Sequence, residues 1–244
     1  MEHDVSNLLY RLPELYETVY DGADHAVARL AERLFQAHLG RPPASLLDIG
    51  CGTGRDLEYL AKRSPDALGV DYQQSMIDYA RQQRPTIDFR TGDMRTLRLG
   101  RHFEAITSFG YAIANVHDNH DIDRVMATYA SHSAPGTLLV LEVIDPAKLD
   151  LLPRRFTLNA PARHAEATAD YIQHPDRQLL ERRRTWRTES APDVHDSVRF
   201  RLLYPQELAH YLDRHGFDVL ATHALDDQMN AASAFVVARR RGEL

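Results

Sequence analysis

Residues 45–54, Ser-Leu-Leu-Asp-Ile-Gly-Cys-Gly-Thr-Gly, decide the fold of this chain. The apolar run 45–49 has the length of a buried strand, and Gly50, Gly52 and Gly54 follow it at alternate positions. Glycines permit a tight turn and let a ligand approach the backbone closely. A helical pattern comes next, and the free N–H groups at the start of a helix can face such a ligand. The stretch therefore predicts a strand, a ligand-binding loop and a helix, in preference to a simple strand–helix turn.

The same alternation of strands and helices continues along most of the chain. Predicted helices cover residues 26–39, 75–81, 122–132 and 206–215, and further strands cover residues 67–70, 87–89, 103–108, 137–144, 217–222 and 234–238. Strands that alternate with helices of this length predict a parallel sheet with helices on both faces.

Residues 146–204 follow a different pattern. Helical periodicity is scarce there, two-residue alternation is common, and residues 174–177 suit a type I turn. We expect an antiparallel insertion of two to four strands, with residues 199–203 as one of them. The basic stretch 182–187 is either one solvated face of a strand or a contact for an acidic substrate or partner.

The composition of the 244 residues narrows the class of protein. The formal net charge is −6, which argues against a dedicated nucleic-acid binder. Cys51 is the lone cysteine, so no internal disulfide framework exists and a reducing compartment is expected. The start of the sequence lacks a signal-peptide pattern, and no segment approaches the roughly 20 apolar residues of a membrane span. We expect a cytoplasmic protein with no membrane partner.

Acidic residues follow the next two predicted strands. Asp71 lies about 20 positions beyond the glycine loop, where a carboxylate can accept hydrogen bonds from both hydroxyls of a ribose. Helix capping is the weaker interpretation of Asp71, because Ser75 is better placed to cap. Asp93 and Met94 end the following strand and suit an adenine amino group and ring. Because open α/β sheets bind ligands at the carboxyl ends of their strands, we expect these sites to form one pocket.

A nicotinamide dinucleotide suits this loop poorly. A loop that binds such a dinucleotide needs a small residue at the position of Arg55. In this chain Asp56 also places a carboxylate where the pyrophosphate would bind. A nucleotide-dependent oxidoreductase is therefore the last of the candidate functions.

The segments 46–54, 70–71, 92–94 and 103–109 resemble, in order and spacing, the cofactor motifs of class I S-adenosylmethionine-dependent methyltransferases. The resemblance implies a Rossmann-like sheet of seven strands, mostly parallel, with an antiparallel β insertion after the fifth strand. It also implies S-adenosylmethionine as the cofactor.

Three segments narrow the resemblance further. Residues 92–95, followed by 99–103, are similar to small amino-sugar N,N-dimethyltransferases of antibiotic biosynthesis, and residues 15–21 are similar to the tyrosine-bearing lid helix of that group. Residues 110–117 depart from the Ser-rich stretch of that group, so the resemblance leaves the acceptor open.

The resemblance implies a set of cofactor-binding residues from the loop, the strand ends and the lid: Tyr20, Asp48, Gly50, Gly52, Asp71, Tyr72, Met76, Asp93, Met94 and Phe109. In this set Gly50 and Gly52 line the methionine part, Asp71 binds the ribose, and Phe109 lies by the transferable methyl group.

Methyl transfer to a neutral amine needs no strong base, whereas transfer to a hydroxyl usually needs one. His117 and Tyr16 are the catalytic candidates, either as bases or as positioning groups, while His195 and Tyr204 are weaker ones. A surface or capping role for His117 remains open, and so does simple helix packing for Tyr16 and Tyr20.

The polar run 117–121 contains metal-ligand residue types, but consecutive residues do not converge on one ion without special folding. We favour a loop and a helix N-terminus capped by Asn119 or Asp121, and we predict no metal. Cys51 is expected to pack under the glycine loop without a lowered pKa.

The sequence therefore predicts a methyltransferase that acts on a small molecule, on nitrogen or on oxygen, in secondary metabolism. A cyclase-type enzyme on the same scaffold and a non-catalytic cofactor-binding partner subunit are the alternatives, and a homodimer is possible. We expect a lid in residues 1–44, a cofactor-binding core in 45–145, a substrate roof in 146–204, and a closing helix and strand pair in 205–244.

Overall fold

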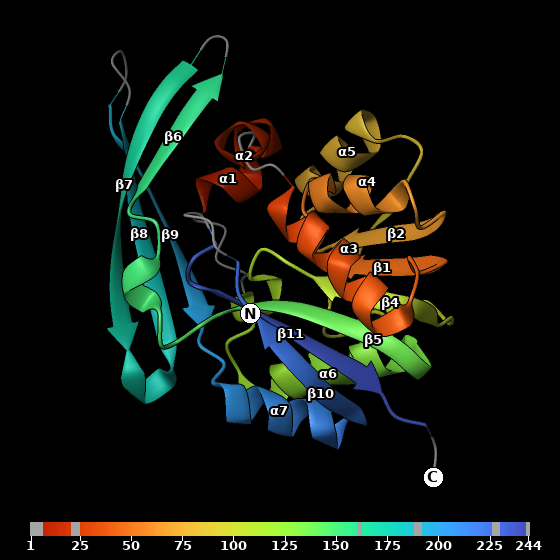
Figure 1. Ribbon diagram of the computed structural model, residues 1–244. Coiled ribbons are helices and arrows are strands. Elements are labelled where there is room, and N and C mark those ends of the chain that lie inside the picture. Colours follow the sequence, from red (N-terminus) through yellow and green to blue (C-terminus); the bar gives the residue numbers. More distant parts are fainter. Residues whose placement is uncertain (1–6, 21–24, 161–162, 188–191, 226–229, 243–244) are drawn as a thin grey trace.

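The computed structural model describes residues 7–20, 25–160, 163–187, 192–225 and 230–242. Its main sheet has seven strands in the order β10-β11-β5-β4-β1-β2-β3 (Figure 1). These strands are β1 (Ser45–Ile49), β2 (Asp66–Asp71), β3 (Asp88–Thr91), β4 (Phe103–Ser108), β5 (Ser133–Ile144), β10 (Phe217–His223) and β11 (Ser233–Arg240). β11 runs antiparallel to both of its neighbours, while the pairs that join β3, β2, β1, β4 and β5 are parallel.

Helices cover both faces of this sheet. α3 (Ala26–Leu39), α4 (Arg55–Ala61) and α5 (Gln74–Gln83) pack on one face, and α6 (Asn119–Ser131) and α7 (Pro205–Arg214) pack on the other. Successive residues of β5 alternate between the two cores, because side chains of a strand point to opposite faces. The sheet is thus buried on both sides, as expected for parallel strands joined by helices.

The insertion forms a second, antiparallel sheet in the order β6-β7-β8-β9. Its strands are β6 (Arg155–Ala160), β7 (Arg163–His174), β8 (Leu179–Arg187) and β9 (Val194–Arg201), and short 3-10 helices lie at Ala112–Asn115, Leu149–Leu151 and Pro175–Arg177. The helices α1 (Leu8–Arg11) and α2 (Pro13–Tyr20) lie between this sheet and the main domain (Figure 1). Leu9, Phe156 and Trp186 belong to the apolar cluster that fixes them to the second sheet.

The predicted fold class, a Rossmann-like sheet with an antiparallel insertion after its fifth strand, is confirmed. Two cap assignments were wrong. α5 begins after Gln73, and the Ser75 hydroxyl donates to the carbonyl of Tyr10 instead of capping. α6 is capped by Asp118, whose side chain accepts from the His120 N–H, because Asp118 still has extended backbone angles.

The third strand lies one to two residues beyond its predicted position and includes Thr91. Its start was misplaced because Ile87 is apolar but lies in the turn before the strand, held by a bond to the carbonyl of Arg84. Within the described part of the chain, no helix has the length and apolar character needed to cross a membrane.

Candidate functional site

A cavity of about 820 Å³ lies between the carboxyl ends of the central strands and the second sheet. Its walls contain all twelve residues that the sequence predicts for the site: Tyr16, Tyr20, Asp48, Gly50, Gly52, Asp71, Tyr72, Met76, Asp93, Met94, Phe109 and His117. These residues come from five separate parts of the chain, and parallel strand ends bring them to one edge. The volume lies toward the upper end of the range of about 300–1,000 Å³ for small-molecule sites.

The glycine loop has backbone angles that only glycine adopts readily. Gly50, Gly52 and Gly54 have φ values of +82°, +54° and +82°. A Cβ atom on Gly50 would lie 2.3 Å from the Cβ of Ala112, so no larger residue fits there. A Cβ on Gly52 would meet no atom within 4 Å, which shows that the backbone at Gly52 faces open space.

Asp71 ties the glycine loop to the tip of β2. Its two carboxylate oxygens accept the backbone N–H groups of Gly52 and Gln73, each at 2.8 Å. Burial raises the pKa of Asp71, although these backbone bonds work against the rise. Each oxygen keeps a second lone pair, so the carboxylate can accept two further bonds from a ligand.

Asp48, the last but one residue of β1, is a buried acid in the same wall. Burial raises its pKa to about 7, while the Thr107 hydroxyl, which donates to it at 2.8 Å, opposes the rise. The negative charges of Asp56 and Asp71 add to the effect. A cationic ligand in the cavity would favour the ionised form of this carboxyl.

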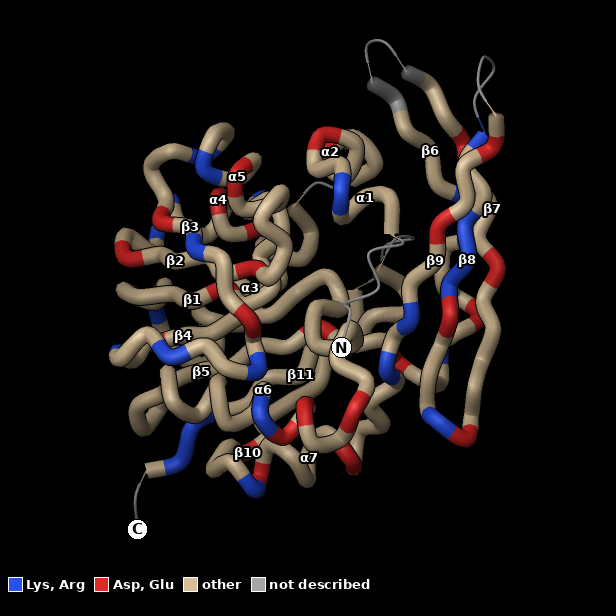
Figure 2. The backbone as a smooth tube through the Cα atoms, turned by 180° about the vertical axis from the view of Figure 1, so that it is seen from behind, with Lys and Arg blue, Asp and Glu red and all other residues tan. Residues whose placement is uncertain are grey.

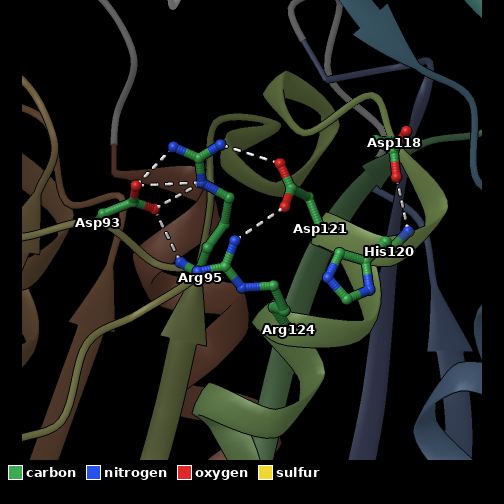
Figure 3. A network of polar contacts seen from close by, with 6 residues as sticks. All are labelled: Asp93, Arg95, Asp118, His120, Asp121 and Arg124. Carbon is green, nitrogen blue, oxygen red and sulfur yellow. Dashed lines mark hydrogen bonds and ion pairs between the residues drawn. The ribbon is translucent and has the colours of Figure 1, made fainter. Parts of the chain in front are cut away.

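A charged network closes the wall near the end of β3 (Figure 3). Arg95 contacts both oxygens of Asp93, the shortest distance being 2.6 Å, and donates to Asp121 at 2.9 Å. Arg124 donates to the other oxygen of Asp121 at 3.2 Å. Burial acts to raise the pKa of Asp121, but the two arginines bring it below its usual value. Arg95 thus fixes the carboxylate that the sequence assigns to adenine, and Met94 lies between this network and the loop.

Glu142, near the end of β5, is a cavity residue that the sequence interpretation missed. It is only 2% exposed, and it accepts the N–H of Gly110 at 2.7 Å and the Ser233 hydroxyl at 2.6 Å. The Tyr111 hydroxyl lies 2.8 Å from the same Ser233 oxygen. A lone acid inside the apolar run of residues 138–144 was the available signal.

The lid helix α2 covers the cavity with two tyrosines. The rings of Tyr16 and Tyr20 lie 4.7 Å apart, and the Tyr16 hydroxyl is 3.9 Å from the point where a Cβ of Gly110 would be. Burial and the neighbouring Tyr20 raise the pKa of Tyr16 well above its usual value. Tyr16 therefore presents a protonated hydroxyl beside Phe109 and Gly110.

Ion pairs hold the lid on the main domain. Glu17 of α2 lies 3.2 Å from Arg84 and 3.9 Å from Arg55. Arg55 also donates to the backbone carbonyl of Tyr20. Arg55, whose bulk argues against a dinucleotide-binding loop, thus connects the glycine loop to α2. The sequence comparison with a lid helix covers residues 15–21, and the last of these, residue 21, lies outside the described residues.

His117 lines the cavity where the core meets the second sheet. Its Nε2 lies 2.9 Å from the carbonyl oxygen of Arg199 and must donate, because a carbonyl only accepts. Two weaker candidates lie elsewhere: the structure places His195 beside Thr185 on a separate shallow surface, and Tyr204 is exposed before α7. Neither residue lines the cavity, whereas residues 197–200 between them do.

The polar run 117–121 is divided among different partners in the structure. Asp118 caps α6, Asp121 pairs with Arg95, and His117 bonds to β9. Among the described residues, no group of three His, Cys, Asp or Glu side chains is arranged to hold a metal ion. Cys51 lies against Gly69, and burial raises the pKa of its thiol well above the usual value.

Comparison with known proteins identifies a family. The family described as "Methyltransferase domain" matches residues 20–222. The chain is 32% identical over 131 residues to a dTDP-3-amino-3,4,6-trideoxy-alpha-D-glucopyranose N,N-dimethyltransferase of Streptomyces venezuelae, a match over 53% of this chain and 55% of that protein. It is 35% identical over 129 residues to a trans-aconitate 2-methyltransferase of Deinococcus radiodurans, over 52% and 46% of the two chains. The chain thus spans about half the length of these curated relatives.

Solved structures share the fold over nearly the whole chain. An S-adenosylmethionine-bound amino pentose methyltransferase of Micromonospora echinaspora superposes with a TM-score of 0.78 and 24% identity, over 92% of this chain and 96% of that one. A sugar N-methyltransferase of a Streptoalloteichus species superposes with a TM-score of 0.79 and 21% identity, over 95% and 93%. Both therefore have the main sheet in common with this chain.

Proposed function

The chain belongs to the methyltransferase-domain family, and from this premise we propose that it transfers methyl groups from S-adenosylmethionine to the amine of a nucleotide-linked amino sugar. The membership confirms the predicted class of protein, a methyltransferase with S-adenosylmethionine as its cofactor. The acceptor and the methylated atom are our inference from the cavity and from the names of the curated relatives.

One observation carries the proposal: the glycine loop, Asp71 and the Asp93–Met94 strand end face one cavity under a tyrosine lid. Asp71 would take the ribose, and Met94 would lie against the adenine. The exposed backbone of Gly52 would admit the methionine part, since nothing lies within 4 Å of its outer side. When bound, the cofactor supplies an electrophilic methyl group on a sulfonium ion.

The charges of the wall suit cationic reactants. Asp48 and Glu142 are buried carboxyls of the cavity wall, and Glu142 contacts Gly110, near which the resemblance places the methyl group. An amine reaches the site mainly as an ammonium ion near neutral pH, and a buried carboxylate attracts it. Glu142 also holds the N–H of Gly110 and so fixes the turn beside Phe109.

The protein's main task in this reaction is alignment. The arriving ammonium ion must first release one proton to solvent, and the neutral amine is then nucleophilic without a strong base. Correct positioning alone can lower the barrier by about 7–11 kcal/mol. The Tyr16 hydroxyl, which stays protonated, can accept a hydrogen bond from the amine and orient its lone pair. His117 holds the roof backbone at Arg199 and so sets the distance between core and roof.

Methylation of a carboxylate is the second candidate, because one relative is named as a trans-aconitate 2-methyltransferase. A carboxylate acceptor needs cationic side chains around it. The acids of the methyl-transfer region would repel it, so this candidate takes second place.

An acceptor panel tests the proposal. Purified protein is incubated with S-adenosylmethionine and either a dTDP-linked 3-amino-deoxyhexose or trans-aconitate, and mass spectrometry follows S-adenosylhomocysteine and the products. We expect the amino sugar to gain two methyl groups, with Asp71→Asn as the inactive control. Product from trans-aconitate alone would establish the second candidate, and no S-adenosylhomocysteine with either acceptor would refute the amino-sugar proposal.

A further inference from the structure

The roof of the cavity contains a buried arginine that forms no ion pair with any carboxylate of the described residues. Arg182 of β8 is 9% exposed and lines the cavity. Its Nε has no hydrogen-bond partner within the described part of the chain, and no ion pair joins it to an Asp or Glu there. An uncompensated buried charge is costly, and proteins keep one chiefly where a ligand or partner completes it.

The other arginines of the cavity wall differ from Arg182. Arg95 pairs with Asp93 and Asp121, Arg55 lies 3.9 Å from Glu17, and Arg199 lies 3.8 Å from Glu181. Each already has an acidic neighbour.

The nearest acid on the roof is fully engaged elsewhere. Asp196 of β9 accepts two bonds from Arg184, at 2.7 and 2.8 Å, and further bonds from the indole N–H of Trp186 and the backbone N–H of Leu8. Arg184 and Asp196 form a buried pair, with side chains only 1% exposed. Asp196 therefore acts on Arg182 only through its field, because its own ion pair is with Arg184, and the described residues give Arg182 no carboxylate of its own.

The surroundings of Arg182 orient its N–H groups. The rings of Phe156 and Phe200 lie over its guanidinium carbon at 5.5 and 5.2 Å. Such contacts use the faces of the planar guanidinium and leave its N–H edge for hydrogen bonds. The phenols of Tyr20, Tyr171 and Tyr10 lie close enough to interact with its charge, and Tyr171 also forms a hydrogen bond with the guanidinium, whereas Nε stays without a partner among the described residues. Figure 2 shows the row of basic residues along β8 to which Arg182 belongs.

We propose that Arg182 is the anion-binding residue of the acceptor site and that it binds the diphosphate of a nucleotide sugar. This rests on the proposed function, because the amine must lie near Gly110 while the diphosphate reaches the roof. A planar guanidinium matches phosphate oxygens in bidentate fashion. The cavity then has two charged ends: acids by the methyl group for the amine, and Arg182 on the roof for the phosphates.

Calorimetric titration with dTDP and with thymidine, which lacks the diphosphate, tests this assignment. We expect Arg182→Met to weaken dTDP binding about 10- to 100-fold, because hydrogen bonds to a charged group are lost. Thymidine affinity should stay unchanged, and Arg182→Lys should retain part of the dTDP affinity. Arg183→Met is the matched control, since Arg183 is the next residue on β8, exposed and paired with Glu181. It should bind dTDP as the wild type does.

Thermal unfolding separates a binding role from a structural one. Removal of an uncompensated buried charge should leave the melting temperature of the ligand-free protein unchanged or higher in Arg182→Met, and the increase on adding dTDP should be lost. Equal dTDP affinity in Arg182→Met and wild type, or no preference of the wild type for dTDP over thymidine, would overturn the inference. Arg182-dependent binding of trans-aconitate without dTDP binding would also overturn it.

Separate titration with S-adenosylhomocysteine distinguishes a failure of the Arg182 inference from a failure of the proposed function. If that compound binds and dTDP does not, the Arg182 inference fails while the cofactor site stands. If dTDP binding depends on Arg182 but the amino sugar is not methylated, the proposed function fails while the anion site stands.

Discussion

The backbone N–H of Gly52 donates to the carboxylate of Asp71 at 2.8 Å and so joins the glycine loop to the neighbouring strand. One carboxylate thereby shapes the loop and keeps lone pairs for a ligand. The proposed ribose contact would make loop geometry and cofactor affinity depend on the same side chain.

Asp71→Asn should therefore impair binding and stability together. An amide presents only one acceptor oxygen, so either Gly52 or Gln73 loses its partner, at a cost of about 1–3 kcal/mol in unfolding free energy. We expect at least a tenfold loss of affinity for S-adenosylhomocysteine by calorimetry. Asp66→Asn, at the exposed start of the same strand, is the control and should bind normally. Normal binding by Asp71→Asn would contradict the assigned role.

Gly50→Ala should destabilise the protein more than Gly40→Ala. Both glycines have positive φ, +82° and +75°, so both variants carry a backbone cost of about 1 kcal/mol. Only at Gly50 does the new Cβ meet another atom, Ala112 at 2.3 Å, which adds about 1–3 kcal/mol of overpacking. Urea denaturation measures the difference, and equal losses would show that the loop relaxes freely.

The stability of the ligand-free protein should fall as the pH rises from about 4 to 7. Burial raises the pKa of Asp48 to about 7, whereas in an unfolded chain it is about 3.9. In that window the folded state retains a proton that the unfolded state has released, so the free energy of unfolding decreases with pH, by up to about 4 kcal/mol. Burial also raises the pKa of Asp56 and Asp71, which act in the same direction, whereas burial lowers the pKa of His132 and His38, which act in the opposite direction in the upper part of this window.

Asp48→Asn should flatten this dependence, while Asp88→Asn, at the exposed start of β3, should retain it. Urea denaturation at several pH values between about 5 and 8 provides the comparison. The same slope in Asp48→Asn and wild type would show that Asp48 is ionised throughout.

His117→Gln should retain activity to within about tenfold, since the glutamine amide can still donate to the carbonyl of Arg199. A catalytic base would instead contribute roughly 10²–10⁴-fold, and its loss would remove the acidic limb of the pH–rate profile. Steady-state kinetics of His117→Gln and His117→Ala across pH separate the cases. Equal, severe loss in both variants would identify a base and would favour hydroxyl over amine methylation.

Local sequence patterns predicted the main sheet and the residues that line the cavity well, because each depends on short-range signals. The helix 26–39 and the strand 103–108 have the predicted bounds, since Gly40 ends the helix and the strand is a short run that is buried almost throughout. Asp71 and Asp93 were found because strand ends in an α/β sheet meet at one edge.

The antiparallel insertion was predicted from the sequence, but the side-chain contacts within it were not. Arg182 and Arg183 are adjacent and chemically identical, yet one is buried over the cavity and the other exposed. Only the register of β8 with β7 and β9 decides between them, and no local signal encodes that register. Glu142 was missed for a related reason, because its partners Gly110 and Ser233 lie on distant segments.

The central claim is that the cavity beside the glycine loop holds the adenosyl cofactor. A crystal structure of the protein with S-adenosylhomocysteine tests it most directly. We predict the ribose hydroxyls at the Asp71 carboxylate, the adenine beside Asp93 and Met94, and the sulfur directed toward Phe109 and Gly110. Electron density for the ligand elsewhere, or a ribose without contact to Asp71, would contradict the account.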